Sequence, residues 1–250
     1  MRPNRLKDIW MKGRKATNCW LSIPSPLTAE MLAHQGWDSL TIDMQHGAVD
    51  YAAMLAMLAA VSASEAVPIV RVSENRSGEI GRALDAGATG VMCPTVNTAD
   101  EAARFVAACR YAPAGVRSVG PLRAALYAGA DYVARANDTV LAIAQIETAT
   151  ALAHVNEIAR VPGLDMLFVG PNDLGLSMGR VATSDQTDPV VVEAIDAVLA
   201  AARMAGIHAG IYCRAPEYGA TMMKKGFDLV TVVGDLGLLS TGAELRRKFD

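Results

Sequence analysis

Polar residues that could do chemistry stand at the ends of short apolar runs in this chain. They occur in the motifs TIDMQHG, VPIVR, AQIET and VGPNDLG, which are far apart in the sequence. Together such groups could bind a cation, stabilise an oxyanion and transfer a proton. The residues concerned are three acids with a histidine, an arginine and a glutamine: Asp43, Glu147, Asp173, His46, Arg71 and Gln145.

The two later acids, Glu147 and Asp173, follow neighbouring apolar runs and could approach a single ion. Two carboxylates, completed by water and substrate oxygens, suit a hard divalent cation such as Mg²⁺ or Mn²⁺. Each carboxylate could instead cap the helix that follows it. The presence of both acids together with Arg71 favours the metal site.

Arg71 ends an otherwise apolar run, so its guanidinium is expected to be buried and to need an anionic partner. One interpretation is a structural salt bridge to Asp43 or Asp85. The other is a cation aimed at a substrate oxyanion. The two interpretations are compatible, and both stay open here.

His46 is the only one of the four histidines at the C-terminal end of a predicted strand. Asp43 precedes it by three residues, which is close enough to orient one ring nitrogen and leave the other as a base. A purely structural histidine is the alternative. The pairing with Asp43 favours a catalytic role.

The lysines exclude one mechanism. None of the six follows an apolar run in the way the polar motifs do, so a Schiff-base nucleophile is absent from the predicted site. The chain also lacks a compact glycine-rich phosphate cradle at the start of a helix. The lysines are Lys7, Lys12, Lys15, Lys224, Lys225 and Lys248.

The elements that must position these motifs alternate between strand and helix. Near-continuous apolar runs are typical of parallel strands buried on both faces. Eight such strands predict a (β/α)8 barrel, whose active site forms at the C-terminal ends of the strands. A doubly wound sheet would need a glycine-rich turn after the first strand, and SIPSPLTAE contains none. The predicted strands are 18–23, 39–44, 68–72, 90–94, 141–147, 166–170, 209–213 and 229–233.

Helix boundary signals stand between the strands. Thr98 with Glu101 predicts a capping box, and Asp188 before Pro189 predicts the start of another helix. Thr241 with Glu244 predicts the start of a C-terminal helix. The segment 111–138 is a long excursion between two strands, which favours a cover over the active site.

Composition limits the function classes. A length of 250 residues fits one barrel domain spanning 1–250, and 52% apolar residues can form its core. The net charge of −3 without a basic stripe argues against nucleic acid or a membrane surface as partner. No run is long enough to span a membrane. Four widely separated cysteines predict neither disulfides nor a zinc site, which indicates a cytoplasmic protein.

Several motifs together resemble the HpcH/HpaI aldolase family, over roughly Trp20 to Asp235. They are TIDMQHG, IVRV, LDAGATGVMCPTVNTADEA, YAPAGVRSVG, AQIET and GLDMLFVGPNDLGLSMG. The resemblance implies a class II pyruvate aldolase that cleaves 4-hydroxy-2-oxo acids. It also implies a homohexamer in which the last helix of the barrel is exchanged between protomers.

The resemblance implies a role for each motif residue. Glu147 and Asp173 match metal ligands, Arg71 matches an enolate-stabilising arginine, and Asp43 with His46 match an acid–base dyad. Three further residues match groups that contact pyruvate or lie near a subunit boundary. These are the side chain of Gln145, the backbone amides of Asn172 and Asp173, and Asp85 near the boundary.

Two departures from the family pattern concern the aldehyde partner. Gln45 stands where members often carry a glutamate, and the loop GPLRAALYAG, with Arg123 and Tyr127, differs from that of well-known members. The pyruvate half of the reaction is unaffected by either departure. The identity of the aldehyde, and the roles of these three residues, stay open.

The sequence therefore predicts an aldolase that uses Mg²⁺, Mn²⁺ or Co²⁺ and releases an aldehyde with pyruvate or hydroxypyruvate. One rival is a malyl- or citramalyl-thioester lyase, which would need a basic groove for coenzyme A that the sequence does not contain. A second rival is a non-catalytic barrel that acts as a binding module. The complete set of polar motif residues argues against that module.

Overall fold

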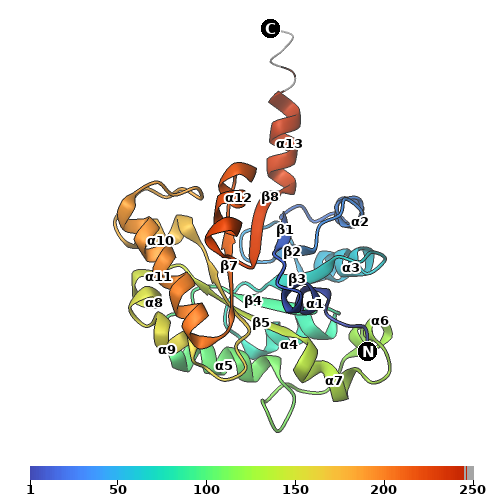
Figure 1. Ribbon diagram of the computed structural model, residues 1–250. Coiled ribbons are helices and arrows are strands. Elements are labelled where there is room, and N and C mark those ends of the chain that lie inside the picture. The colour runs from blue at the N-terminus through green and yellow to red at the C-terminus, as the bar shows by residue number, and fades with distance from the viewer. Residues whose placement is uncertain (245, 247–250) are drawn as a thin grey trace.

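Eight parallel strands close into a barrel in chain order, with β1 paired to both β2 and β8 (Figure 1). The computed structural model describes residues 1–244 and 246. All eight predicted strands are confirmed, each within two residues of its predicted bounds, and the fold is the predicted (β/α)8 barrel. The strands are β1 Ala16–Leu21, β2 Ser39–Asp43, β3 Val67–Arg71, β4 Gly90–Cys93, β5 Leu141–Ile146, β6 Met166–Val169, β7 His208–Tyr212 and β8 Leu229–Gly234.

The strands are buried on both faces, which explains their continuous apolar sequences. Their outward residues form the main core with the surrounding helices, and their inward residues fill the barrel. Helix α1 (Arg5–Met11) closes the N-terminal end of the barrel with Leu6, Ile9 and Trp10. Trp10 stacks on His208 at the start of β7, with ring centroids 4.1 Å apart. The interior of the barrel is therefore closed at this end.

The other helices surround the barrel, and several begin and end as their sequences predict. Thr98 accepts a hydrogen bond from the amide of Glu101, although Glu101 bonds the amide of Asn97 instead of completing a capping box. Asp188 caps the longest helix. The helices are α2 Pro26–Ala33, α3 Tyr51–Val61, α4 Ser77–Asp85, α5 Ala99–Cys109, α6 Leu122–Ala128, α7 Tyr132–Thr139, α8 Ala149–Ala153, α9 Val155–Ala159, α10 Pro171–Ser177, α11 Pro189–Ala205, α12 Pro216–Lys225 and α13 Asp235–Glu244. None of these helices is long and apolar enough to cross a membrane.

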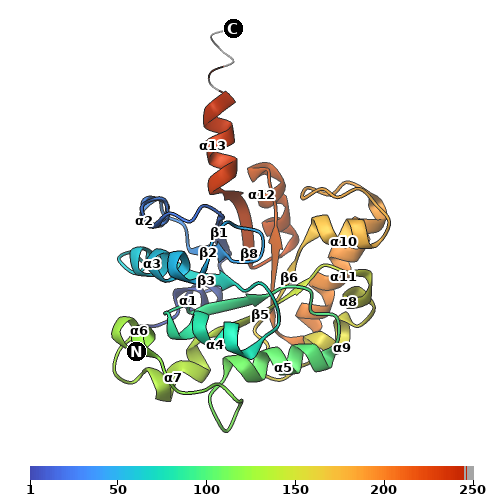
Figure 2. The same cartoon turned by 180° about the vertical axis from the view of Figure 1, so that it is seen from behind.

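The C-terminal helix starts earlier than predicted. α13 begins at Asp235, directly after β8, so Thr241 lies inside the helix and does not start it. The side chain of Asp235 accepts the amide of Leu236, which supports a start at this residue. The helix extends away from the barrel in both views (Figures 1 and 2), and Leu236 and Leu239 are more than half exposed.

The excursion 111–138 does not cover the C-terminal end of the barrel, contrary to the prediction. α5 returns the chain to the N-terminal end before the excursion begins, so α6 and α7 form beside the N-terminus (Figure 1). The amide of Arg2 bonds the carbonyl of Ala128, and the side chain of Asn4 bonds the carbonyl of Thr139. The segment therefore stabilises the closed end of the barrel.

Arg123 and Tyr127 lie in this segment and have structural contacts. The Arg123 guanidinium donates to the carbonyls of Ala86 and Leu58, at the ends of α4 and α3. Tyr127 packs under the guanidinium of Arg2 at 4.8 Å. Neither side chain is near the C-terminal end of the barrel in its own chain, so this loop does not line the predicted site there.

Candidate active site

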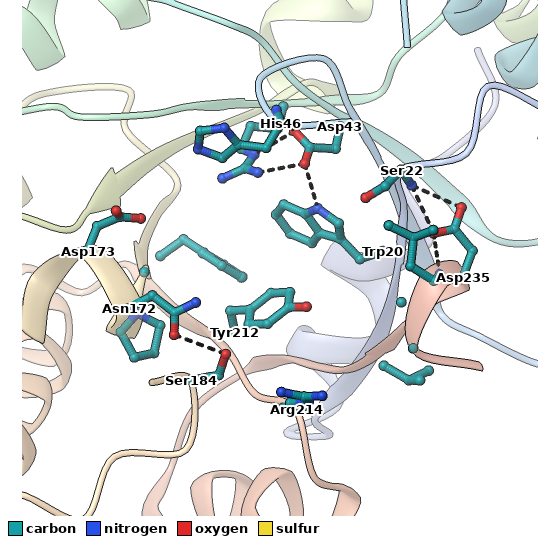
Figure 3. Close-up of a pocket in the computed structure, with 18 of the residues that line it drawn as sticks. Trp20, Ser22, Asp43, His46, Asn172, Asp173, Ser184, Tyr212, Arg214 and Asp235 are labelled. Carbon is teal, nitrogen blue, oxygen red and sulfur yellow. Dashed lines mark hydrogen bonds and ion pairs between the residues drawn. The ribbon is translucent and has the colours of Figure 1, made fainter. Parts of the chain in front are cut away.

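A pocket of about 470 Å³ opens at the C-terminal ends of the strands (Figure 3). It receives side chains from β1, β2, β3, β5, β6, β7 and β8 and from the first turn of α10. The register of the parallel barrel aligns these ends, although their residues are far apart in the sequence. The predicted site residues that line it are Asp43, His46, Arg71, Gln145, Asn172 and Asp173.

Asp43 and Arg71 form the best-connected pair in the pocket. They are register partners on β2 and β3, and Nε and Nη2 of Arg71 donate to the two carboxylate oxygens of Asp43 at 2.9 and 2.6 Å. Both side chains are less than a tenth exposed. The predicted salt bridge of Arg71 is therefore confirmed with Asp43 and not with Asp85, while the guanidinium still faces the pocket.

Trp20, at the end of β1, supports this pair. Its indole N–H donates to Asp43 at 3.1 Å, and the Arg71 guanidinium lies 4.8 Å from the centre of its ring. Burial alone would raise the pKa of Asp43. The hydrogen bonds and charge of Arg71, with the N–H groups of Trp20 and His46, outweigh burial and hold that pKa below its ordinary value. Asp43 is thus an ionised carboxylate with fixed partners.

The predicted side-chain bond between Asp43 and His46 is absent. Asp43 accepts the backbone amides of Gln45 and His46 at 3.0 and 3.2 Å, so the turn after β2 folds back onto its carboxylate. With these amides, Arg71 and Trp20, the two carboxylate oxygens are fully occupied. The His46 ring is exposed at the pocket edge and has no hydrogen-bond partner in the part of the chain that the structure describes. Asp43 therefore positions the backbone of His46 rather than its ring.

Glu147 lies behind the pocket surface at the end of β5. Its Oε1 accepts the amide and hydroxyl of Thr95 at 2.7 and 3.1 Å, and its Oε2 accepts the side-chain N–H of Gln145 at 2.6 Å. Burial raises the pKa of Glu147 and the charge of Asp173 raises it further, against the opposing hydrogen bonds of Thr95. A side chain at Gly170 would place its Cβ 2.7 Å from Glu147 Oε2, so only glycine leaves that oxygen accessible.

The carboxylate pair fits a divalent cation. Asp173 projects from α10 into the pocket and has no hydrogen-bond or ion-pair partner among residues 1–244 and 246 (Figure 3). The buried Oε1 of Gln145 also lacks a partner. No group of three or more His, Cys, Asp or Glu gathers among these residues. The chain therefore offers two carboxylates, of which Asp173 raises the pKa of Glu147 by its charge, and a hard cation completed by water and substrate oxygens would relieve that repulsion.

Asp85 does not reach the pocket of its own chain. It is the last residue of α4, which runs back from the C-terminal end of the barrel, and its carboxylate pairs with Arg117 at 2.8 Å. Arg117 is held by the hydroxyl of Tyr132 in the excursion. Gln45 is likewise not a lining residue, and its buried Oε1 has no partner among the residues the structure describes.

The site residues that the sequence analysis missed include Thr95, Trp20, Ser184, Tyr212 and Arg214. Thr95 adopts a φ of +53°, which is strained for a β-branched residue and aims both of its donors at Glu147. No local pattern marks this backbone. Tyr212 and Arg214 carried a signal that was available, because they lie near and just past the end of the predicted strand 209–213, whereas Trp20 falls inside the predicted strand 18–23.

Comparison with known proteins places the chain in a family. Residues 16–241 match the family described as HpcH/HpaI aldolase/citrate lyase. The chain is 41% identical to a hydroxypyruvate/pyruvate aldolase of Rhizorhabdus wittichii, with 96% of each chain covered. It is 36% identical to a 2-dehydro-3,6-dideoxy-6-sulfogluconate aldolase of Pseudomonas putida, with 90% of this chain and 88% of that protein covered.

A solved structure agrees with this assignment. The crystal structure of an HpcH/HpaI aldolase/citrate lyase family protein from Burkholderia cenocepacia superposes with a TM-score of 0.91 at 36% identity. The match covers 99% of this chain and 100% of that chain. The fold and site thus define a barrel lyase that acts on carbon–carbon bonds. The chain belongs to the HpcH/HpaI aldolase/citrate lyase family, which confirms the predicted resemblance.

Proposed function

We propose that this chain is a divalent-metal-dependent aldolase that reversibly cleaves a 4-hydroxy-2-oxo acid into an aldehyde and pyruvate or hydroxypyruvate. The observation that carries this proposal is the placement of the Asp43-bound Arg71 guanidinium in one pocket with the free carboxylate of Asp173, beside Glu147. The names of the relatives support the reaction type, and the hydroxypyruvate/pyruvate aldolase supports both donors.

Glu147 and Asp173 would hold the metal ion, with Mg²⁺, Mn²⁺ and Co²⁺ as candidates. When bound, the ion supplies Lewis-acid charge to the oxygens of the 2-oxo acid. Asn172 and Asp173 lie in the first turn of α10, where backbone N–H groups lack intrahelical acceptors and no side chain caps them. These amides would receive the carboxylate of the donor, and the side chain of Gln145 would contact the donor beside Glu147.

Arg71 and His46 would carry the chemical step. His46 takes the proton of the C4 hydroxyl, directly or through a water molecule. The C4 oxygen then forms the aldehyde carbonyl as the C3–C4 bond breaks, and the electron pair of that bond passes into the enolate. Arg71 stabilises the enolate oxygen with donors that Asp43 leaves free. The enolate then takes a proton at C3, from the protonated His46 or from water, to give pyruvate or hydroxypyruvate. In the synthetic direction His46 returns the proton to the new alkoxide.

The proposal includes the assembly and the setting of the protein. Exposed leucines on α13 support its exchange with another protomer, in a homohexamer built of barrel domains spanning 1–250. Asp85 would act at a subunit boundary, since it does not reach the pocket of its own chain. The four free, buried cysteines support a cytoplasmic location.

Aldol addition tests this function directly. The purified protein, stripped of metal and then supplied with Mg²⁺, Mn²⁺ or Co²⁺, is incubated with pyruvate or hydroxypyruvate and a panel of aldehydes. Product should form only with added metal, and pyruvate alone should exchange its methyl protons with solvent. Absence of both exchange and addition with every metal would overturn the proposal.

A further inference from the structure

The pocket has a second wall that the proposed reaction does not use. We call it the outer wall, and it consists of Ser184, Tyr212 and Arg214. Figure 3 shows these three residues on the opposite side of the pocket from Asp43 and His46. Arg214 is an exposed cation that lines the pocket, and no carboxylate of residues 1–244 and 246 lies within ion-pair distance of its guanidinium. It contrasts with Arg71, whose charge is matched by Asp43.

The backbone beneath Arg214 is held in place. The two carboxylate oxygens of Asp185 accept the amides of Arg214 and Ala215 at 2.8 and 2.9 Å. Asp185 thus bonds the backbone of this segment, and no ion pair joins it to the Arg214 guanidinium. The next residue, Gln186, donates to the carbonyl of Pro171 at 3.2 Å, which ties the same loop to the start of α10. The guanidinium thus extends from a fixed backbone and has no acid partner in the part of the chain that the structure describes.

Tyr212 connects this cation to the reacting centre. Its ring stands edge-on to Trp20, with centroids 5.4 Å apart at 90°. Burial raises the pKa of the Tyr212 hydroxyl, against the lowering effect of both Arg71 and Arg214, so the group stays a neutral donor. Tyr212, Arg71 and Arg214 line the same pocket. The outer wall therefore presents a neutral hydroxyl followed by an unmatched positive charge.

We propose that Arg214 binds an anionic group at the far end of the aldehyde partner. This inference rests on the proposed function, in which Arg71, Glu147 and Asp173 handle the donor. A pocket of about 470 Å³ exceeds what a three-carbon donor fills, and the remaining space leads to the outer wall. The guanidinium fork suits the shared geometry of carboxylate, sulfonate and phosphate oxygens. The preferred acceptors are thus aldehydes with a terminal anion.

The test measures aldol addition of pyruvate by the metal-loaded protein. The charged acceptors are succinic semialdehyde, sulfoacetaldehyde and glycolaldehyde phosphate, and the neutral acceptors are propanal and butanal. The wild-type protein should have a higher kcat/KM for at least one charged acceptor than for both neutral ones. The three charged acceptors distinguish carboxylate, sulfonate and phosphate as the group bound. No preference for any of them would overturn the proposal.

Variants of Arg214 test whether this residue causes the preference for charged acceptors. Arg214→Gln should lower the ratio of charged to neutral kcat/KM by roughly 10-fold to 100-fold, the value of a charge-assisted hydrogen bond. Arg214→Lys should restore part of the ratio. Arg160→Gln, an exposed arginine on the outside of the barrel, is the matched control and should leave it unchanged. An unchanged ratio in Arg214→Gln, or equal losses with both kinds of acceptor, would overturn the proposal.

Failure of this inference is distinguishable from failure of the proposed function. If pyruvate exchanges protons and adds to neutral aldehydes, but Arg214→Gln keeps the wild-type ratio, only the role of Arg214 is wrong. If the wild-type protein neither exchanges protons nor adds pyruvate to any acceptor, the proposed function is wrong and this inference falls with it.

Discussion

The two walls of the pocket differ in how completely their polar groups are matched. On the wall formed by Trp20, Asp43 and Arg71, which we call the inner wall, every oxygen of Asp43 is occupied and the ion pair is buried. On the outer wall, Arg214 has no acid partner, and no hydrogen bond of the Tyr212 hydroxyl occurs within residues 1–244 and 246. A polar group that has its hydrogen-bond and ion-pair partners within the protein is held in one geometry. A polar group without such partners is available to a ligand.

This difference separates two tasks of an enzyme. Groups that act on the reacting atoms must be held within a fraction of an ångström, which buried and fully bonded neighbours achieve. Groups that select a substrate gain most when the ligand supplies their missing partner. The inner wall therefore fits the step common to all substrates, and the outer wall fits the choice among them. The following predictions test this division, starting with the largest expected effect.

Loss of the carboxylates that we propose to hold the metal should have the largest effect. Glu147→Gln or Asp173→Asn should lower turnover roughly 10⁴-fold or more, because a catalytic metal supplies several kcal/mol of charge stabilisation. Metal content by elemental analysis should fall in parallel. Glu157→Gln, an exposed acid on α9, is the matched control. Full turnover in metal-free wild-type protein would rule out a class II mechanism.

Replacement of His46 should affect the proton transfer and leave the rest of the site intact. His46→Ala should lower the cleavage rate by about 10²–10⁴-fold, the usual contribution of a positioned acid–base group. Metal content and pyruvate affinity should stay at the wild-type level, since the ring has no partner in the described chain. His154→Ala, on the helical outside of the barrel, is the control. A cleavage rate near that of the wild type would assign the proton to another base.

Arg71→Lys should not behave as a conservative change. Lysine keeps the charge but loses the fork that bonds both oxygens of Asp43, so the expected loss of turnover is roughly 10²-fold. The ratio of charged to neutral acceptors should stay constant, because the outer wall sets it. Steady-state rates with both acceptor classes measure this. Near-normal turnover in the folded variant would leave Arg71 with the structural role alone.

Replacement of Thr95 should have the smallest effect of these substitutions. Thr95→Ala keeps the amide bond to Glu147 and removes the hydroxyl bond, which should weaken metal binding roughly 10-fold. Isothermal titration with Mn²⁺ measures the affinity without reference to turnover. Thr221→Ala on α12, whose hydroxyl bonds only its own helix, is the matched control. Equal affinities in wild type and Thr95→Ala would show that the backbone amide alone positions Glu147.

The sequence by itself determined the elements and the end of the barrel at which chemistry occurs. Continuous apolar runs specify strands buried on both faces, and the caps at Thr98 and Asp188 act within one turn of their own helices. Polar residues at the ends of these runs must then meet, because parallel strands of a closed barrel end on the same side. For this reason Asp43, Arg71 and Asp173 could be assigned to one pocket.

Only the tertiary structure decided which atoms in that pocket are partners. Asp43 is bonded by Arg71, 28 residues away, and is thereby unavailable to the ring of the nearby His46. Glu147 is bonded by Thr95, 52 residues away, through a backbone conformation that no local pattern announces. The direction of α4 likewise places Asp85 at the opposite end of the barrel. Spacing along the chain limits what can meet, but register and helix direction select the contacts, because hydrogen bonds form between atoms brought within about 3 Å.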